Sequence, residues 1–110
     1  MEQQSEHQRL VDYPVVFLCN QGVGDGRLST LSMNGGTIES ATAVPRGTVL
    51  TLRMQLPAHA QPIAVDQAEV TWTAGSHFGV QFLSLGTRDE IRLGQLLAGL
   101  QQNLRQTEAA

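Results

Sequence analysis

Hydroxyl and glycine residues gather in residues 29–36, which read STLSMNGG. The Ser32 hydroxyl and the backbone N–H groups from Asn34 to Gly36 are groups with which a loop can bind a phosphate. Arg9, which we expect on a flexible N-terminal segment, can close over such an anion through charge-assisted hydrogen bonds. The same glycines also suit a tight turn between two strands, so the stretch alone supports either a ligand site or a hairpin.

Residue types that support catalysis or metal binding are scattered along the chain. The three histidines fall in a tail, a loop and the start of a strand, without the spacing to another His or to the single Cys that a metal site needs. Ser32 lacks the Gly-x-Ser-x-Gly setting of a hydrolase nucleophile. We therefore expect a binding protein and not an enzyme, with no metal and no cofactor.

The composition is that of one small globular domain. The chain has 110 residues, 41 % of them hydrophobic, and a formal net charge of −3 at pH 7. A negative net charge argues against binding to nucleic-acid polymers. No apolar run approaches the roughly 20 residues of a membrane-spanning helix, and no N-terminal signal segment is visible. We therefore expect no membrane insertion and a cytoplasmic location.

The spacing of apolar residues predicts a mainly β protein. Strands are expected at residues 13–18, 27–32, 36–40, 48–57, 63–75 and 77–82. Residues 20–26 are rich in glycine and are expected to form a turn or loop, and a tight turn at residues 34–36 is expected to join two strands. Because strands and helices do not alternate, the strands are expected to be antiparallel, in a small barrel or sandwich.

Alternation along the strands predicts the core. Residues 48–57 alternate cleanly, whereas the inward phase of residues 63–75 changes near Asp66 and Gln67, which predicts a β-bulge or sharp bend. The expected buried residues are Leu50, Leu52, Met54, Val70, Trp72, Val80 and Phe82.

The chain is expected to end in a helix at residues 87–104. Thr87 and Glu90 form a capping-box signature, and the leucines that follow have helical spacing. This gives a tail at residues 1–8, one domain at residues 9–105 and a second tail at residues 106–110.

The succession of predicted strands and terminal helix resembles the PilZ domain family, whose members are bacterial receptors for the second messenger cyclic diguanylate (c-di-GMP). The likeness runs from about Arg9 to Leu104. It is carried by GRLSTLSMNGGTIES, GTVLTLRMQLP, IAVDQAEVTW, FGVQF and the terminal helix. The resemblance implies an all-β fold, a six-stranded antiparallel barrel with a C-terminal α-helix. It also implies a ligand site made of an R-x-x-x-R motif in the N-terminal segment and a D/N-x-S-x-x-G motif on the strands after it.

Carried over to this chain, the resemblance implies a ligand site of Arg9, Tyr13, Arg27, Thr30, Ser32, Asn34 and Gly35. Ser32 and Gly35 match the second motif, while Thr30 stands at its Asp/Asn position. Arg9 matches the first arginine, and Tyr13 stands where the second is expected. A tyrosine can stack on a base but cannot form the charge-assisted fork of an arginine. Arg27, beside the motif strand, is a candidate for the missing positive charge.

Two functions follow from this pattern. The first, which we take as the prediction, is a c-di-GMP receptor domain in bacterial signalling, for example in the regulation of motility or biofilm formation. The second is a PilZ-like adaptor that has lost nucleotide binding and acts through protein contacts, and the departures at Tyr13 and Thr30 favour it. In both cases we expect a separate effector protein to receive the signal.

Overall fold

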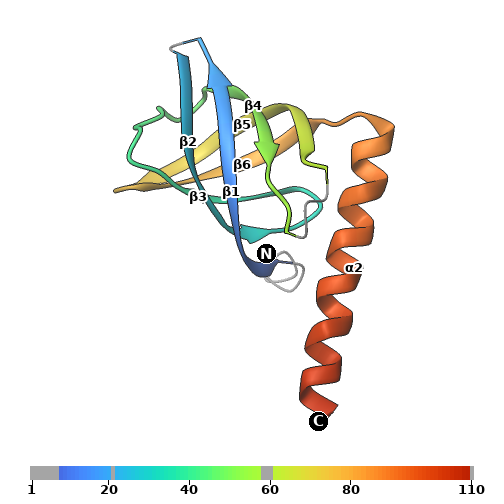
Figure 1. The fold of residues 1–110 in the computed structure, drawn as a ribbon. Helices are drawn as coiled ribbons and strands as arrows, with labels where there is room; N and C mark the ends of the chain where they lie inside the picture. The colour runs from blue at the N-terminus through green and yellow to red at the C-terminus, as the bar shows by residue number, and fades with distance from the viewer. Residues whose placement is uncertain (1–7, 21, 58–60, 110) are drawn as a thin grey trace.

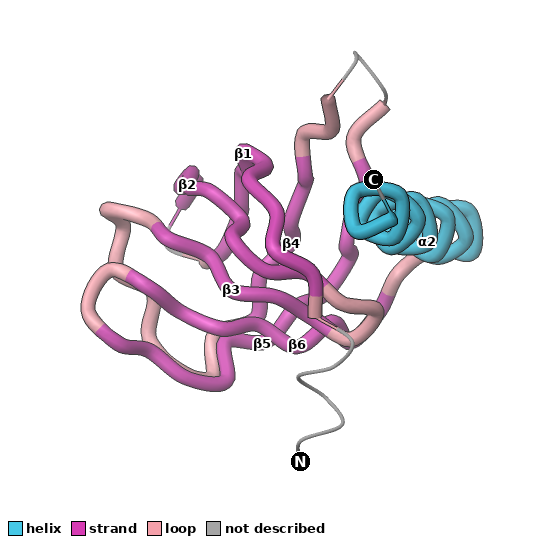
Figure 2. Tube along the Cα trace, turned by 90° about the horizontal axis from the view of Figure 1, so that it is seen from below, coloured by secondary structure: helices cyan, strands magenta, loops and turns pink. Residues whose placement is uncertain are grey.

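The computed structural model describes residues 8–20, 22–57 and 61–109, which form a closed antiparallel β-barrel followed by a helix (Figure 1). The strands are β1 (Arg9–Cys19), β2 (Gly22–Leu31), β3 (Gly35–Glu39), β4 (Val49–Met54), β5 (Ile63–Ala74) and β6 (His77–Ser84). They close in the order β1-β2-β3-β6-β5-β4, and helix α2 (Thr87–Ala109) lies beside the ring of strands (Figure 2). The predicted six-stranded barrel with a C-terminal helix is confirmed.

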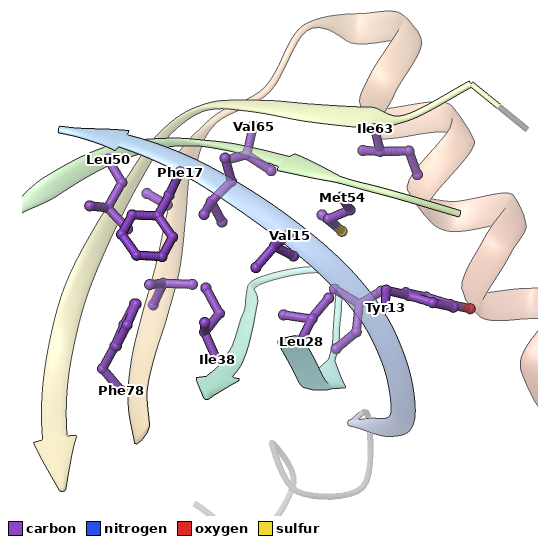
Figure 3. Packing of buried hydrophobic residues seen from close by; sticks show 14 of the residues in the cluster. Tyr13, Val15, Phe17, Leu28, Ile38, Leu50, Met54, Ile63, Val65 and Phe78 are labelled. Carbon is purple, nitrogen blue, oxygen red and sulfur yellow. The ribbon is translucent and has the colours of Figure 1, made fainter. Parts of the chain in front are cut away.

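The core fills the inside of the barrel. Every strand contributes inward side chains, because alternate residues of a strand point to opposite faces of the sheet. On β4 the side chains of Leu50, Leu52 and Met54 are at most 1 % exposed, as their alternation predicts. The rings of Phe17 and Phe78 meet edge to face with centroids 5.7 Å apart (Figure 3).

The predicted bulge in β5 is confirmed. Leu50 pairs with Ala68 and Leu52 with Val65, so two residues of β5, Asp66 and Gln67, lie opposite one residue of β4. The extra residue restores the inward phase on both sides of the bulge, which explains why Val65 and Ala68 are both fully buried.

A second register shift contradicts the predicted burial of Trp72. Val70 pairs with Val80, but Trp72 pairs with Gly79, so the pairing of β5 with β6 slips by one residue between them. The slip places Trp72 on the outer face of the barrel, where its side chain is 42 % exposed. Phe82 is only partly buried against the core.

Within the predicted loop at residues 20–26, residues 22–26 form the first half of a strand. β2 begins at Gly22, and its first half pairs with β1 down to the end of the hairpin, with Phe17 opposite Gly24. Pairing along this hairpin outweighs the low strand preference of glycine and aspartate. The turn between β2 and β3 also lies earlier than expected, at residues 32–34, because Gly35 and Gly36 belong to β3.

Helix α2 begins at Thr87 as predicted and packs against the barrel through Leu93, which is fully buried. Its first turns are also tied to the residues before β5. Arg92 donates hydrogen bonds to the backbone oxygens of Pro62 (2.9 Å) and Gln61, and Arg88 donates to Gln61 Oε1 at 2.8 Å. The helix then continues past the end of the barrel (Figure 1). Within the described residues, no helix combines the length and apolar character needed to cross a membrane.

Candidate functional site

A pocket of about 430 Å³ lies over β3, β6 and β5. It is lined by Gln8, Ser32, Asn34, Gly35, Gly36, Thr37, Thr71, Trp72, Val80 and Gln81. Three of the seven residues expected at a ligand site, Ser32, Asn34 and Gly35, therefore meet here. The sequence analysis did not assign Trp72, Thr71, Thr37 or Gln81 to the site.

The turn at residues 32–34 forms one wall of the pocket, and Ser32 holds its shape. The N–H of Ser32 donates to the Gly35 oxygen at 2.9 Å, and Ser32 Oγ accepts from the N–H of Asn34 at 3.2 Å. The Asn34 oxygen accepts from the N–H of Phe82 at 2.7 Å, which ties the turn to β6. The expectation that the Asn34 N–H is free for a phosphate is thus wrong, because this N–H is bonded within the turn. The exposed Asn34 side chain remains available at the rim.

Gly35 is required by the close approach of β3 to β6. A Cβ at this position would collide with the backbone oxygen of Val80. The glycine of the sequence motif therefore has a structural role in the barrel wall, and it also keeps the floor of the pocket free of a side chain.

Thr30 does not line the pocket but supports a residue that does. Its Oγ1 donates to Oγ1 of Thr37 at 3.0 Å, and Thr37 lies on the pocket floor. Thr30 and Thr37 also face each other in the pairing of β2 with β3. Thr30 therefore places a neutral hydroxyl at the Asp/Asn position of the motif, and this hydroxyl is hydrogen-bonded to Thr37.

Trp72 provides the aromatic surface of the pocket. Its indole lies against Gly79, the residue of β6 opposite Trp72 in the register. Gly79 in turn pairs with Thr37 of β3, so Trp72 on β5 and Thr37 on β3 lie on either side of β6. Two features of the sequence indicate that Trp72 can point outward. It lies between Thr71 and Thr73, and the inward face of the same segment already changes phase near Asp66 and Gln67.

Arg9 lies beside the pocket and not on a flexible segment. It is the first residue of β1, pairs with Leu31 of β2, and follows Gln8, which lines the pocket. Its Nη1 donates to the backbone oxygen of Gln8 at 3.2 Å. Arg9 therefore lies on the strand next to the motif residues and beside one end of the pocket, but it does not itself line the pocket.

Tyr13 is part of the core and does not line the pocket. Its side chain is 8 % exposed, and its ring points from β1 toward α2 (Figure 3). Burial raises the pKa of its phenol above the ordinary value. The bulge between Leu10 and Tyr13 in β1 sets this inward phase. The structure therefore does not bring Tyr13 together with Ser32 and Gly35.

Arg27 also lies apart from the pocket. Its Nε binds Asp12 Oδ1 at 2.6 Å on the outer surface, and this hydrogen bond and charge lower the pKa of Asp12 and raise that of Arg27. Arg27 borders a different hollow, together with Pro14, Asp25 and Glu39. The structure thus pairs Arg27 with a carboxylate and places it away from the motif turn.

The chemistry of the pocket is that of a neutral, hydrogen-bonding aromatic site. No charged side chain is among its described lining residues. An indole face can stack on a planar ring, and the amides of Asn34 and Gln81 can each donate and accept hydrogen bonds at the edge of such a ring. Arg9 follows the lining residue Gln8 in the chain but does not itself line the pocket.

Comparisons with known proteins agree with this architecture. The PilZ domain family model matches residues 3–99. Among solved structures, the chain is similar to the PilZ domain of CeSA from a cellulose-synthesizing bacterium, with 17 % identity, a TM-score of 0.67, and coverage of 86 % of this chain and 98 % of that one. It is also similar to YcgR of Escherichia coli in complex with c-di-GMP, with 14 % identity, a TM-score of 0.77 and coverage of 93 % and 47 %.

A further likeness is to the inhibitor of motility MotI/DgrA of Bacillus subtilis, with 17 % identity, a TM-score of 0.73 and coverage of 87 % and 49 %. The chain thus spans about half the length of the YcgR and MotI chains. At these identities the likeness shows the fold. No curated protein sequence matches the chain. The family model covers most of the chain, and the closed barrel, terminal helix and motif turn agree with it, so the chain belongs to the PilZ domain family.

Proposed function

We propose that this PilZ domain is a non-enzymatic receptor for c-di-GMP, which binds in the pocket between the motif turn at residues 32–34 and Trp72. The observation that carries the proposal is the meeting of Ser32 and Gly35, the two residues that match the family motif, with an exposed indole in one pocket. The solved structure of YcgR, similar to this chain in fold, is a complex with the same ligand.

The pocket offers the contacts that a guanine base requires. A guanine has a planar face, acceptors at O6 and N7, and an amino donor. Trp72 supplies the stacking surface, and the amides of Asn34 and Gln81 lie in the same lining. Base stacking on an aromatic side chain contributes about 1–3 kcal/mol per base. Trp72 is therefore the residue to which we assign the largest single contribution from base recognition.

Arg9 is the residue to which we assign the phosphate contact. It is adjacent to Gln8 at the pocket border and carries a guanidinium group with several N–H donors. Because no charged side chain lies in the described lining, the site has fewer cations than an R-x-x-x-R motif would supply. We therefore expect c-di-GMP to bind more weakly here than at a site with two arginines. We also expect the loss of Arg9 to reduce the affinity more than the loss of one arginine would at such a site.

The alternative function, an adaptor that no longer binds the nucleotide, is favoured by one observation. Tyr13, at the position of the second arginine of the motif, is a core residue here, so the chain has no second cation at this position that reaches the pocket. Under this alternative the barrel acts through protein contacts alone. In either case, we propose that a separate effector protein receives the signal.

The test uses the single tryptophan of the chain as a probe. Because all indole fluorescence comes from Trp72, stacking of a guanine must quench it with a saturable dependence on c-di-GMP concentration. GMP is the matched control, since it offers the same base without the cyclic dinucleotide scaffold, and we expect much weaker quenching. Saturable quenching in the parent that is lost in Arg9→Ala supports the receptor function. Fluorescence of the parent that stays unchanged at every c-di-GMP concentration supports the adaptor function.

A further inference from the structure

The outer face of β1 carries apolar side chains where an antiparallel sheet ordinarily presents polar ones to water. Val16 and Leu18 point outward from β1, and Val23 points outward beside them from β2. These three side chains are between 40 % and 71 % exposed. We call these three residues, with Asp25 of β2 and Arg53 of β4, the β1 face.

The β1 face is separate from the pocket and is not covered by α2. None of its residues lines the pocket at the motif turn. The half of β1 that carries Val16 and Leu18 ends at the tip of the β1–β2 hairpin, and both views show this tip standing apart from α2 (Figures 1 and 2). A contiguous exposed apolar surface with a charged border is typical of a protein contact site.

Two opposite charges border the apolar strip symmetrically. In the register of the sheet, Val16 pairs with Asp25 on one side and with Arg53 on the other. Both charged side chains are exposed, and neither forms an ion pair with any residue that the structure describes. From β2 across β1 to β4, the β1 face therefore presents a negative charge, an apolar strip and a positive charge.

This order is complementary to itself. If a second copy is laid face to face about a two-fold axis parallel to β1, each Asp25 comes opposite Arg53 of the other copy, and the apolar strips of the two copies meet between them. A two-fold axis across β1 would instead bring Asp25 against Asp25 and Arg53 against Arg53, which is repulsive. The charges thus select one of the two face-to-face arrangements, and closed two-fold pairs of this kind are the commonest assembly of soluble proteins.

We propose that the β1 face is an interaction surface for a second copy of this chain, with Asp25 and Arg53 forming two symmetric intermolecular ion pairs around Val16 and Leu18. The face spans three strands of a convex barrel, so the contact is smaller than the about 800 Å² per partner of a standard interface. We therefore expect a reversible dimer that dissociates at micromolar concentrations.

The test is sedimentation equilibrium of the full chain over a range of concentrations. Asp25→Arg and Arg53→Asp should each weaken dimerisation at least about tenfold, because each places like charges opposite one another twice per dimer. The double variant, with both charges exchanged, should return the dimer to within about threefold of the parent. Leu18→Asp should abolish it. Ile91→Asp, at an exposed position on α2, is the matched control and should have no effect.

Several results would overturn the proposal. One is a parent chain that stays monomeric at hundreds of micromolar. Another is a dimer that the single charge reversals leave unchanged, or that the double exchange fails to restore. Equal loss in Ile91→Asp would place the contact on α2 instead. Because these positions are exposed, thermal unfolding by circular dichroism should be the same for the charge variants and the parent, which separates a lost contact from a lost fold.

Discussion

The indole of Trp72 lies directly against Gly79, in the space that a side chain at position 79 would fill. A Cβ added to Gly79 would collide with Nε1 of the indole and approach Cδ1 to 2.7 Å. Gly79 also lies between Thr37 and Trp72 in the sheet, so this contact joins the floor of the pocket to its aromatic wall. The position of the indole therefore depends on the absence of a side chain one strand away.

The first prediction follows from this contact. Gly79→Ala should push the indole away from the barrel, so the emission of Trp72 should shift to the red and c-di-GMP binding should weaken. Loss of a stacked base corresponds to about 1–3 kcal/mol, or roughly fivefold to 150-fold in affinity. The measurement is a fluorescence titration of parent and variant.

Gly99→Ala is the control for this prediction, because nothing lies within 4 Å of a Cβ at that helical position. It should leave binding unchanged and stabilise the chain by up to about 1 kcal/mol, through the better helix propensity of alanine. Equal emission and affinity in Gly79→Ala and the parent would show that the indole is not held by this contact.

The second prediction concerns the core. Leu52 is fully buried in β4, so Leu52→Ala should lower the free energy of unfolding by about 2–5 kcal/mol through lost burial and the cavity left behind. Leu83→Ala, at a half-exposed position on the outside of β6, should cost far less. Denaturant unfolding of the two variants checks the difference, and similar losses would contradict the inward phase assigned to β4.

The third prediction is a pH dependence from Tyr13. Its pKa is raised by burial, so the folded chain holds the phenolic proton more tightly than the unfolded chain does. The resulting stability is fully present below the unfolded value of about 10 and is lost as the pH rises through the folded pKa. Since Tyr13 is the single tyrosine, tyrosinate absorbance reports this titration directly.

Tyr13→Phe should remove this part of the alkaline loss of stability. Stability near neutral pH should change little, because the phenol forms no hydrogen bond with any residue that the structure describes. An absorbance titration at the ordinary tyrosine pKa in the folded chain would mean that the phenol is exposed, against the placement in Figure 3.

The fourth prediction concerns the attachment of α2. Arg92 donates to two backbone oxygens, those of Gln61 and Pro62, so Arg92→Ala should destabilise the chain by about 1–3 kcal/mol. Arg46 is exposed and bonds to no other residue that the structure describes, so Arg46→Ala should stay within about 0.5 kcal/mol of the parent. Thermal unfolding of both variants tests this prediction. Equal melting temperatures of Arg92→Ala and Arg46→Ala would show that these hydrogen bonds do not hold the helix to the barrel.

Much of the fold could be predicted from local patterns. The alternation of β4 predicts its buried face, and the phase change at Asp66 and Gln67 predicts the bulge, because a strand that changes phase must insert a residue to keep one face inward. The capping box at Thr87 likewise predicts the start of α2. Each of these signals lies within one segment of the chain.

The errors arose where the position of a residue depends on a second strand. Trp72 continued the inward phase of Val70 in sequence, but the register with β6 slips between them, and nothing within β5 alone reports that slip. The sequence predicts a loop at Gly24, but pairing with Phe17 places this residue in a strand. The pocket shows the same limit, since Thr37, Thr71 and Gln81 come from three strands that only the closed barrel brings together.

The measurement that tests the central claim most directly is isothermal titration calorimetry of the chain with c-di-GMP, alongside Trp72→Ala and Arg9→Ala. Receptor function predicts saturable heat with a dissociation constant in the micromolar range for the parent and at least about fivefold weaker binding for each variant. An absence of heat with the folded parent at ligand concentrations up to about 1 mM would contradict the receptor and leave the barrel as a protein-binding adaptor.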